Sequence, residues 1–68
     1  MLTDSQHDHL EYLLNGLGTV KPLLPRRSAE FVDQITEAFS EFNWHTRLSQ
    51  KQMDWLESLY TQHVGPLD

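Results

Sequence analysis

The chain has 68 residues, with ten acidic against five basic side chains, a formal net charge of −5 at pH 7 and no cysteine. Its length suits one small domain spanning residues 1–68, and the lack of cysteine excludes a disulfide scaffold. The charge opposes the phosphate attraction that drives non-specific nucleic-acid binding, and no apolar run approaches the roughly 20 residues of a membrane span. We therefore expect a cytoplasmic protein with no membrane partner.

A first helix is predicted over residues about 4–17. Thr3 and Gln6 have the spacing of a capping box, in which each side chain satisfies a backbone amide at the helix start. A leucine stripe at helical spacing follows, made of Leu10, Leu13, Leu14 and Leu17. The glycines of "NGLG", Gly16 and Gly18, favour a helix end there.

The next segment, "TVKPLLPRR", contains two prolines, which prevent a continuous helix. We expect its apolar residues to pack beneath the domain, namely Val20, Leu23 and Leu24. A second helix is predicted over about 26–43, because apolar residues recur along one side of it. That side carries Phe31, Val32, Ile35, Ala38, Phe39 and Phe42.

Four carboxylates recur at spacings of three, four and four along the opposite side of this second helix. We name them the acidic strip; they are Glu30, Asp33, Glu37 and Glu41. The strip is interpreted either as a solvated face or as a docking surface for a basic partner.

A third helix is predicted over about 49–64. Ser49 and Gln52 form a second capping box, and Leu48 is placed to pack on Met53 across the helix start. The apolar side that follows holds Met53, Leu56, Leu59, Tyr60, His63 and Val64. Gly65 and Pro66 then end the helix.

Trp55 lies at the margin of that apolar side, next to Lys51 and Gln62. One interpretation is that its ring packs on a neighbouring helix and leaves its indole N–H in water. The other is that Trp55, Lys51 and Gln62 bind a partner, since interface hot spots are rich in tryptophan.

The stretch "FVDQITEAFSEF", followed by "LSQKQMDWLESLYTQH", resembles a helical hairpin in small proteins of phages and other mobile elements, with the pattern L-S-x-K-Q-x-x-W-[LV]-x-x-L. The matching residues are Leu48, Ser49, Lys51, Gln52, Trp55, Leu56 and Leu59. The resemblance covers about the last 35 residues, implies a phage or plasmid setting, and carries no catalytic or ligand residues.

No residue pattern predicts enzymatic chemistry. His7 and His9 are about 200° apart on a helix, and His7 with Glu11 would give two ligands where zinc needs three or four. His45 and His63 are expected to have structural roles. The sequence has no phosphate-binding glycine loop and no nucleophile elbow, so we expect neither a metal, nor a cofactor, nor catalysis.

The basic residues support an alternative. Lys21, Arg26 and Arg27 share one short stretch, whereas Arg47 and Lys51 flank the start of the third helix. These five residues are the candidates for nucleic-acid binding. In a helix-turn-helix arrangement Gln50 and Gln52 would be of the type that reads adenine, although the connection "NWHTR" is long for that motif.

The predicted fold is all-α, a compact three-helix bundle. Its expected core comprises Leu10, Leu13, Leu14, Leu17, Phe31, Ile35, Phe39, Phe42, Leu56 and Tyr60. We expect a non-enzymatic protein that binds a host protein handling nucleic acid and inhibits or modulates it. A nucleic-acid-binding regulator and a structural homo-oligomeric subunit remain as alternatives, and a homodimer is compatible with all three.

Overall fold

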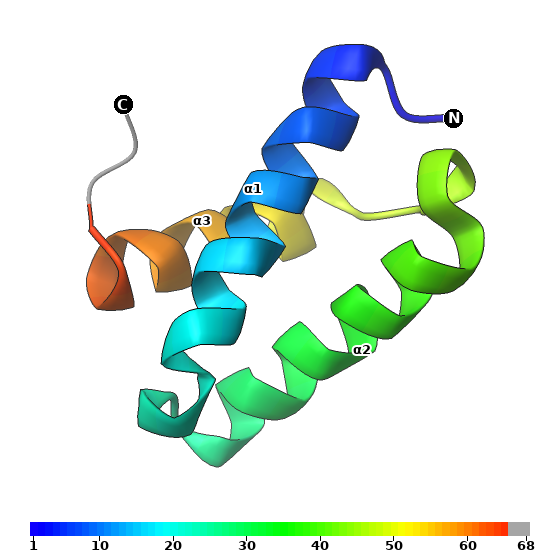
Figure 1. Cartoon of the computed structure of the whole chain (residues 1–68). Helices are drawn as coiled ribbons and strands as arrows, with labels where there is room; N and C mark the ends of the chain where they lie inside the picture. Colours follow the sequence, from blue (N-terminus) through cyan, green and yellow to red (C-terminus); the bar gives the residue numbers. More distant parts are fainter. Residues whose placement is uncertain (66–68) are drawn as a thin grey trace.

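A computed structural model describes residues 1–65 and confirms an all-α, three-helix fold for that part of the chain (Figure 1). The helices are α1 (Asp4–Val20), α2 (Arg26–Phe42) and α3 (Gln50–His63). Short 3₁₀ turns lie in the two connections, η1 (Lys21–Leu23) and η2 (Asn43–His45). The radius of gyration, 11.1 Å, matches the roughly 11 Å expected of a compact chain of this length. Pro66 of the predicted helix stop lies outside the described residues.

Helix α1 lies between the other two helices and packs against both of them (Figure 1). Its leucines form the centre of the core, because Leu10, Leu13 and Leu17 are completely buried. Leu56 of α3 and Val32 of α2 reach the same core from the two sides. Burial of each such side chain contributes roughly 1.5–3 kcal/mol to stability. Helix α1 therefore contributes a large share of the stability of the fold.

Both predicted capping boxes are present. Thr3 Oγ1 accepts from the Gln6 amide at 3.1 Å, and Gln6 Oε1 accepts from the Thr3 amide at 3.0 Å. Ser49 and Gln52 exchange the same two bonds at 3.1 and 2.8 Å. Helix α2 differs, since it follows Pro25 and has no side-chain cap.

The predicted end of the first helix was wrong. Helix α1 continues through both glycines to Val20, and the 3₁₀ turn containing Pro22 follows directly. The proximity of α3 explains why position 16 is a glycine. A Cβ atom at this position would lie 2.4 Å from Cε2 of Tyr60. Glycine therefore allows close approach of two helices here and does not terminate one.

Most of the expected core is buried, but Phe42 is not; Leu23, expected to pack beneath the domain, and Val64, on the apolar side of the third helix, are also exposed. Phe42 is 52% exposed, Leu23 is 75% exposed and Val64 is 39% exposed. Phe42 was expected in the core because it continues the apolar side of α2, but the first turns of α1 and the last turns of α2 diverge (Figure 1). Leu23 points outward from η1, whereas Leu24 is buried and Val20 packs partly against the core.

Phe39 of the expected core is only partly buried, although it packs against the buried cluster. Val32 and Leu59 belong to that cluster as well. Across residues 1–65, every helix falls short of the length and apolar character that a membrane span requires.

Candidate functional site

The acidic strip divides into two halves. Arg26 Nε donates to Glu30 Oε1 at 3.2 Å, and Lys21 of η1 forms an ion pair with Asp33. Glu37 and Glu41 are exposed and have no hydrogen-bond or ion-pair partner within the described residues. The uncompensated negative charge of α2 therefore lies in its second half.

The same contacts divide the five candidate nucleic-acid-binding residues. Lys21 and Arg26 face carboxylates of the acidic strip, so they do not form a continuous basic patch with their neighbours. Arg27, Arg47 and Lys51 are exposed and have no ion-pair partner in residues 1–65. The structure thus leaves free basic charge mainly around the start of α3.

Trp55 packs on a neighbouring helix. Its ring is stacked on Phe31 of α2, with centroids 4.1 Å apart and planes inclined by 14°. An aromatic pair of this kind contributes about 0.5–1.5 kcal/mol beyond its buried area. Trp55 nevertheless remains 39% exposed, and its neighbours Lys51 and Gln62 are exposed on the same side of α3.

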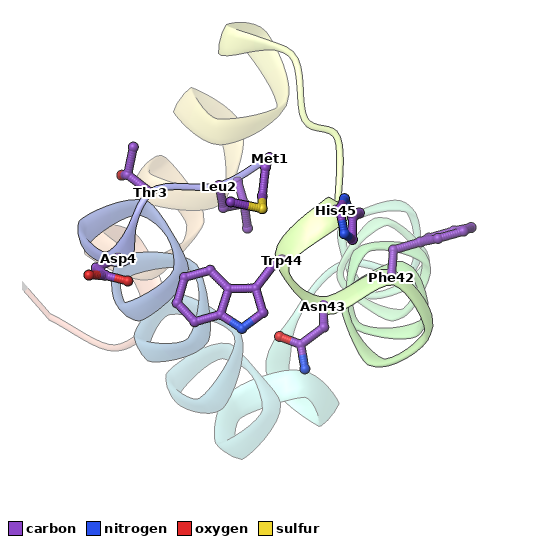
Figure 2. Close-up of a pocket in the computed structure, with 8 residues that line it drawn as sticks. All are labelled: Met1, Leu2, Thr3, Asp4, Phe42, Asn43, Trp44 and His45. Carbon is purple, nitrogen blue, oxygen red and sulfur yellow. The ribbon is translucent and has the colours of Figure 1, made fainter.

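A groove that the sequence did not predict lies where α1 and α2 diverge. We name it the end groove; it has a volume of about 540 Å³ and is lined by Met1, Leu2, Thr3, Asp4, Phe42, Asn43, Trp44 and His45 (Figure 2). Trp44 is 37% exposed and points across the groove towards the N-terminal segment, whereas Phe42 points away from it (Figure 2). Two partly exposed aromatic rings, Phe42 and Trp44, therefore lie at this end of the molecule.

A second groove of about 480 Å³ adjoins the first, and we name it the side groove. It is lined by Met1, Ala38, Phe42, His45 and Arg47. Met1, Phe42 and His45 line both grooves. Its lining thus comes from the N-terminus, from α2 and from the segment that follows α2.

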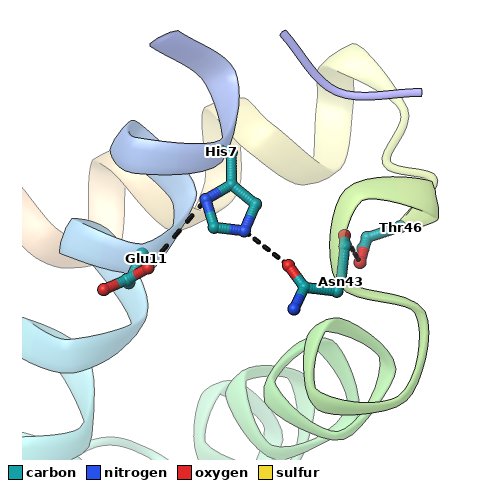
Figure 3. Close-up of polar contacts among 4 residues, drawn as sticks. All are labelled: His7, Glu11, Asn43 and Thr46. Atoms are coloured by element: carbon teal, nitrogen blue, oxygen red, sulfur yellow. Dashed lines mark hydrogen bonds and ion pairs between the residues drawn. The ribbon is translucent and has the colours of Figure 1, made fainter. Parts of the chain in front are cut away.

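His7 of α1 contacts the residues beneath the end groove. Its ring is stacked on Trp44, with centroids 3.9 Å apart, and tilted against Phe39. Nε2 donates to Asn43 Oδ1 at 2.5 Å, and Nδ1 lies 3.9 Å from a carboxylate oxygen of Glu11 (Figure 3). These contacts connect α1 to the turn after α2.

Backbone geometry fixes the same turn. Asn43 has φ +50° and ψ −113°, angles close to those of the first central residue of a type II′ turn, where glycine, asparagine and aspartate are common. Its carbonyl accepts from both the amide and the hydroxyl of Thr46, at 3.1 and 2.7 Å (Figure 3). The Leu2 amide donates to the Trp44 carbonyl at 2.7 Å, which ties the N-terminal segment to the turn.

Sequence reasoning missed this site because it assigned Phe42 to the core and read "NWH" as a plain connection. The available signal was local, since an asparagine of turn type directly precedes a tryptophan and a histidine in "FNWH". That pattern indicates a turn presenting aromatic rings. It does not indicate which side chain of another helix would meet them.

His9 Nε2 lies 3.1 Å from Glu57 Oε1 and links α1 to α3. Within residues 1–65 no three histidine, cysteine, aspartate or glutamate side chains are grouped so that they could hold a metal ion. The arrangement offers binding surfaces.

No protein-family model matches this chain, and no curated protein or solved structure is significantly similar to it. The resemblance to the phage hairpin therefore depends on the sequence pattern of residues 48–59.

Proposed function

We propose that this protein is a non-enzymatic binding module of a phage or another mobile element, which docks on a host protein that handles nucleic acid and inhibits or modulates it. The observation that carries the proposal is the pair Glu37 and Glu41, exposed on one helix and without an ion partner in residues 1–65. Their counterparts Glu30 and Asp33 are paired with basic residues of the same chain.

The spacing of these two carboxylates suits a basic protein surface. Residues four apart on an α-helix are separated by about 6 Å along its axis and lie on nearly the same side. A rigid helix therefore presents two negative charges at a fixed separation, with no cost for ordering a loop on binding. The net charge of −5 adds long-range attraction towards a basic nucleic-acid groove and raises the association rate.

Trp55 supplies the second part of the proposed interface. Stacking on Phe31 fixes its ring, and the exposed part of the ring is available to a partner. A tryptophan held in one orientation loses little conformational entropy on binding, which is why such residues are frequent hot spots. Lys51 and Gln62 provide polar contacts on the same side of α3.

The test is affinity capture from bacterial lysate, performed with and without nuclease. We compare the wild-type chain with Glu37→Lys and with the matched control Asp8→Lys, which makes the same charge change at an exposed residue of α1 that has no ion partner in residues 1–65. A protein retained after nuclease is identified and its affinity measured with purified material. Glu37→Lys is expected to weaken binding at least about tenfold through charge repulsion, and Asp8→Lys to leave it nearly unchanged.

Competition with duplex DNA completes the experiment. If the captured protein uses a nucleic-acid groove, excess DNA displaces this chain from it. Equal binding by wild type and Glu37→Lys would contradict the acidic docking surface. Material that disappears with nuclease, and that depends on Arg47 and Lys51, would favour the nucleic-acid-binding alternative instead.

Trp55→Ala tests the second contact. The variant is expected to fold with a modest loss of stability, about 0.5–1.5 kcal/mol from the lost stack plus the loss of buried area. It should also weaken the purified complex by about tenfold or more, because truncation of a hot spot costs over about 2 kcal/mol. Wild-type affinity in a folded Trp55→Ala protein would restrict the role of this residue to packing on Phe31.

A further inference from the structure

Trp44 presents a fixed aromatic ring to the end groove. His7 of α1 stacks on the ring, with centroids 3.9 Å apart and planes inclined by 16°, and no other ring of residues 1–65 contacts it. His7 does not line the groove, so the groove meets the part of the indole that His7 leaves uncovered. The Trp44 carbonyl also accepts from the Leu2 amide at 2.7 Å. A ring held in this way loses little conformational freedom when a ligand binds.

Asp4 supplies the charge of the end groove. Its carboxylate is exposed and has no ion-pair partner in residues 1–65, the amino group of Met1 included. In the part of the chain that the structure describes, no lysine, arginine or second carboxylate lines the groove, and the other ionisable side chain there is His45. The dipole of α1 accounts for a carboxylate in its first turn. It does not account for an exposed tryptophan in the same groove.

The rest of the lining restricts the chemistry of an occupant. Met1 and Leu2 add apolar side chains near the indole ring (Figure 2). The volume of about 540 Å³ lies within the roughly 300–1,000 Å³ of ligand sites. A purely apolar occupant would take the Asp4 carboxylate out of water without pairing it, which is costly, and an anion would be repelled by it. The groove therefore suits a cation that also has a flat or apolar part.

We propose that the end groove binds an arginine side chain of a partner protein, with the guanidinium stacked on Trp44 and hydrogen-bonded to the Asp4 carboxylate. A guanidinium is planar and weakly hydrated, so it stacks on an indole while its N–H groups donate to a carboxylate. Tryptophan gives the strongest cation–π contacts, and hydrogen bonds between charged groups are among the strongest in proteins. The aliphatic stem of the arginine packs on Leu2. Lysine has the same charge but no planar group to stack.

The inference goes beyond the proposed function, because the end groove contains none of the residues of that docking surface, neither Glu37 and Glu41 nor Trp55. It concerns another end of the molecule and one particular side chain of a partner. A free arginine derivative tests it without any host protein. A negative result with this derivative leaves the capture experiment with Glu37→Lys unchanged, so the two proposals fail separately.

The first test titrates the isotope-labelled chain with N-acetyl-arginine amide at constant chloride concentration and follows the indole N–H signals by NMR. The chain has two tryptophans, so Trp55 serves as an internal control, and Trp55→Phe assigns the signals. The Trp44 signal is expected to shift with a dissociation constant on the order of 1–10 mM, while the Trp55 signal stays in place. N-acetyl-citrulline amide has nearly the same shape and no charge, and should bind at least about fivefold more weakly.

The second test removes each contact in turn. Asp4→Asn keeps the shape of the side chain without its charge and should weaken arginine binding at least about fivefold. The matched control Asp8→Asn makes the same change at an exposed residue of α1 outside the groove, and should bind as the wild type does. Trp44→Leu keeps an apolar side chain without the aromatic face and should abolish binding, followed through the Asp4 backbone amide. Circular dichroism checks folding, and Asp4→Asn decides the outcome if Trp44→Leu does not fold.

Three results would overturn the inference. The first is a Trp44 signal that does not move up to about 50 mM N-acetyl-arginine amide, or moves no more than that of Trp55. The second is equal affinity for the citrulline derivative. The third is wild-type affinity in folded Asp4→Asn protein.

Discussion

Gly16 and Gly18 differ in their surroundings although both lie within α1. A Cβ atom on Gly16 would lie 2.4 Å from one carbon of the Tyr60 ring and 3.1 Å from another, whereas a Cβ atom on Gly18 would meet no atom within 4 Å. Tyr60 is buried in the core, so its ring has little room to move away. The two positions therefore form a matched pair within one helix.

We predict opposite effects for alanine at these two positions. Gly18→Ala should stabilise the protein by about 0.5–1 kcal/mol, because alanine loses less backbone entropy in a helix. Gly16→Ala gains the same term but strains the contact with Tyr60, at a cost of about 1–3 kcal/mol, and should be destabilising overall. Urea denaturation measures both. Equal stabilisation by the two substitutions would show that α1 and α3 do not approach each other at Gly16.

Asn43 combines a positive φ with a side-chain hydrogen bond to His7. Asn43→Ala should lose the hydrogen bond, worth about 0.5–1.5 kcal/mol, and it keeps a Cβ at a backbone conformation with positive φ. Asn43→Gly loses the same bond but relieves the backbone, so it should be clearly less destabilising than alanine. Thermal melting by circular dichroism checks the order of the two variants, and the reverse order would contradict the backbone argument.

The helices begin in different ways. Helices α1 and α3 each have a complete capping box, while α2 begins after Pro25 without a side-chain cap and with arginines in its first turn. Positive charge at that end opposes the helix dipole. Helix α2 therefore depends more on its packing against α1 than on local interactions at its start.

The cap of α3 gives a prediction for this element. Ser49→Ala removes the acceptor for the Gln52 amide and should cost about 1 kcal/mol of stability. Ser49→Asp keeps an acceptor at the same position and should retain most of that stability. The free energy of unfolding in urea measures the difference. Equal stability of both variants would indicate that the start of α3 frays in solution.

The whole molecule is small, and its stability is expected to be roughly 3–10 kcal/mol for a chain of this length. Its core depends on α1, which contacts both neighbours, while Trp55 and Phe31 join α2 to α3. The loss of one large buried side chain is therefore a considerable fraction of the total.

Substitutions at Ile35 and Phe42 test how much of the stability of the fold one side chain contributes. Ile35 is buried in the core, so Ile35→Ala should cost about 2–5 kcal/mol and bring the protein close to unfolding. Phe42→Ala should cost much less because its ring is largely exposed. Glu37→Lys should remain within about 0.5 kcal/mol of wild type. Denaturant titration compares the three variants, and a large loss of stability in Phe42→Ala would place that ring in the core.

The sequence by itself determined the starts of α1 and α3, because each capping box joins residues three apart in the chain. It also determined the leucine face of α1 and the position of Trp55 beside the apolar side of α3, since both follow from helical periodicity. Only the tertiary structure decided that α1 continues past Gly16, that Phe42 is exposed, and that half of the acidic strip is paired. Two of these features involve residues distant in the chain, since Gly16 meets Tyr60 of α3 and Lys21 pairs with Asp33, 12 positions further on. Local periodicity describes one helix and contains no information on how closely the next helix approaches it.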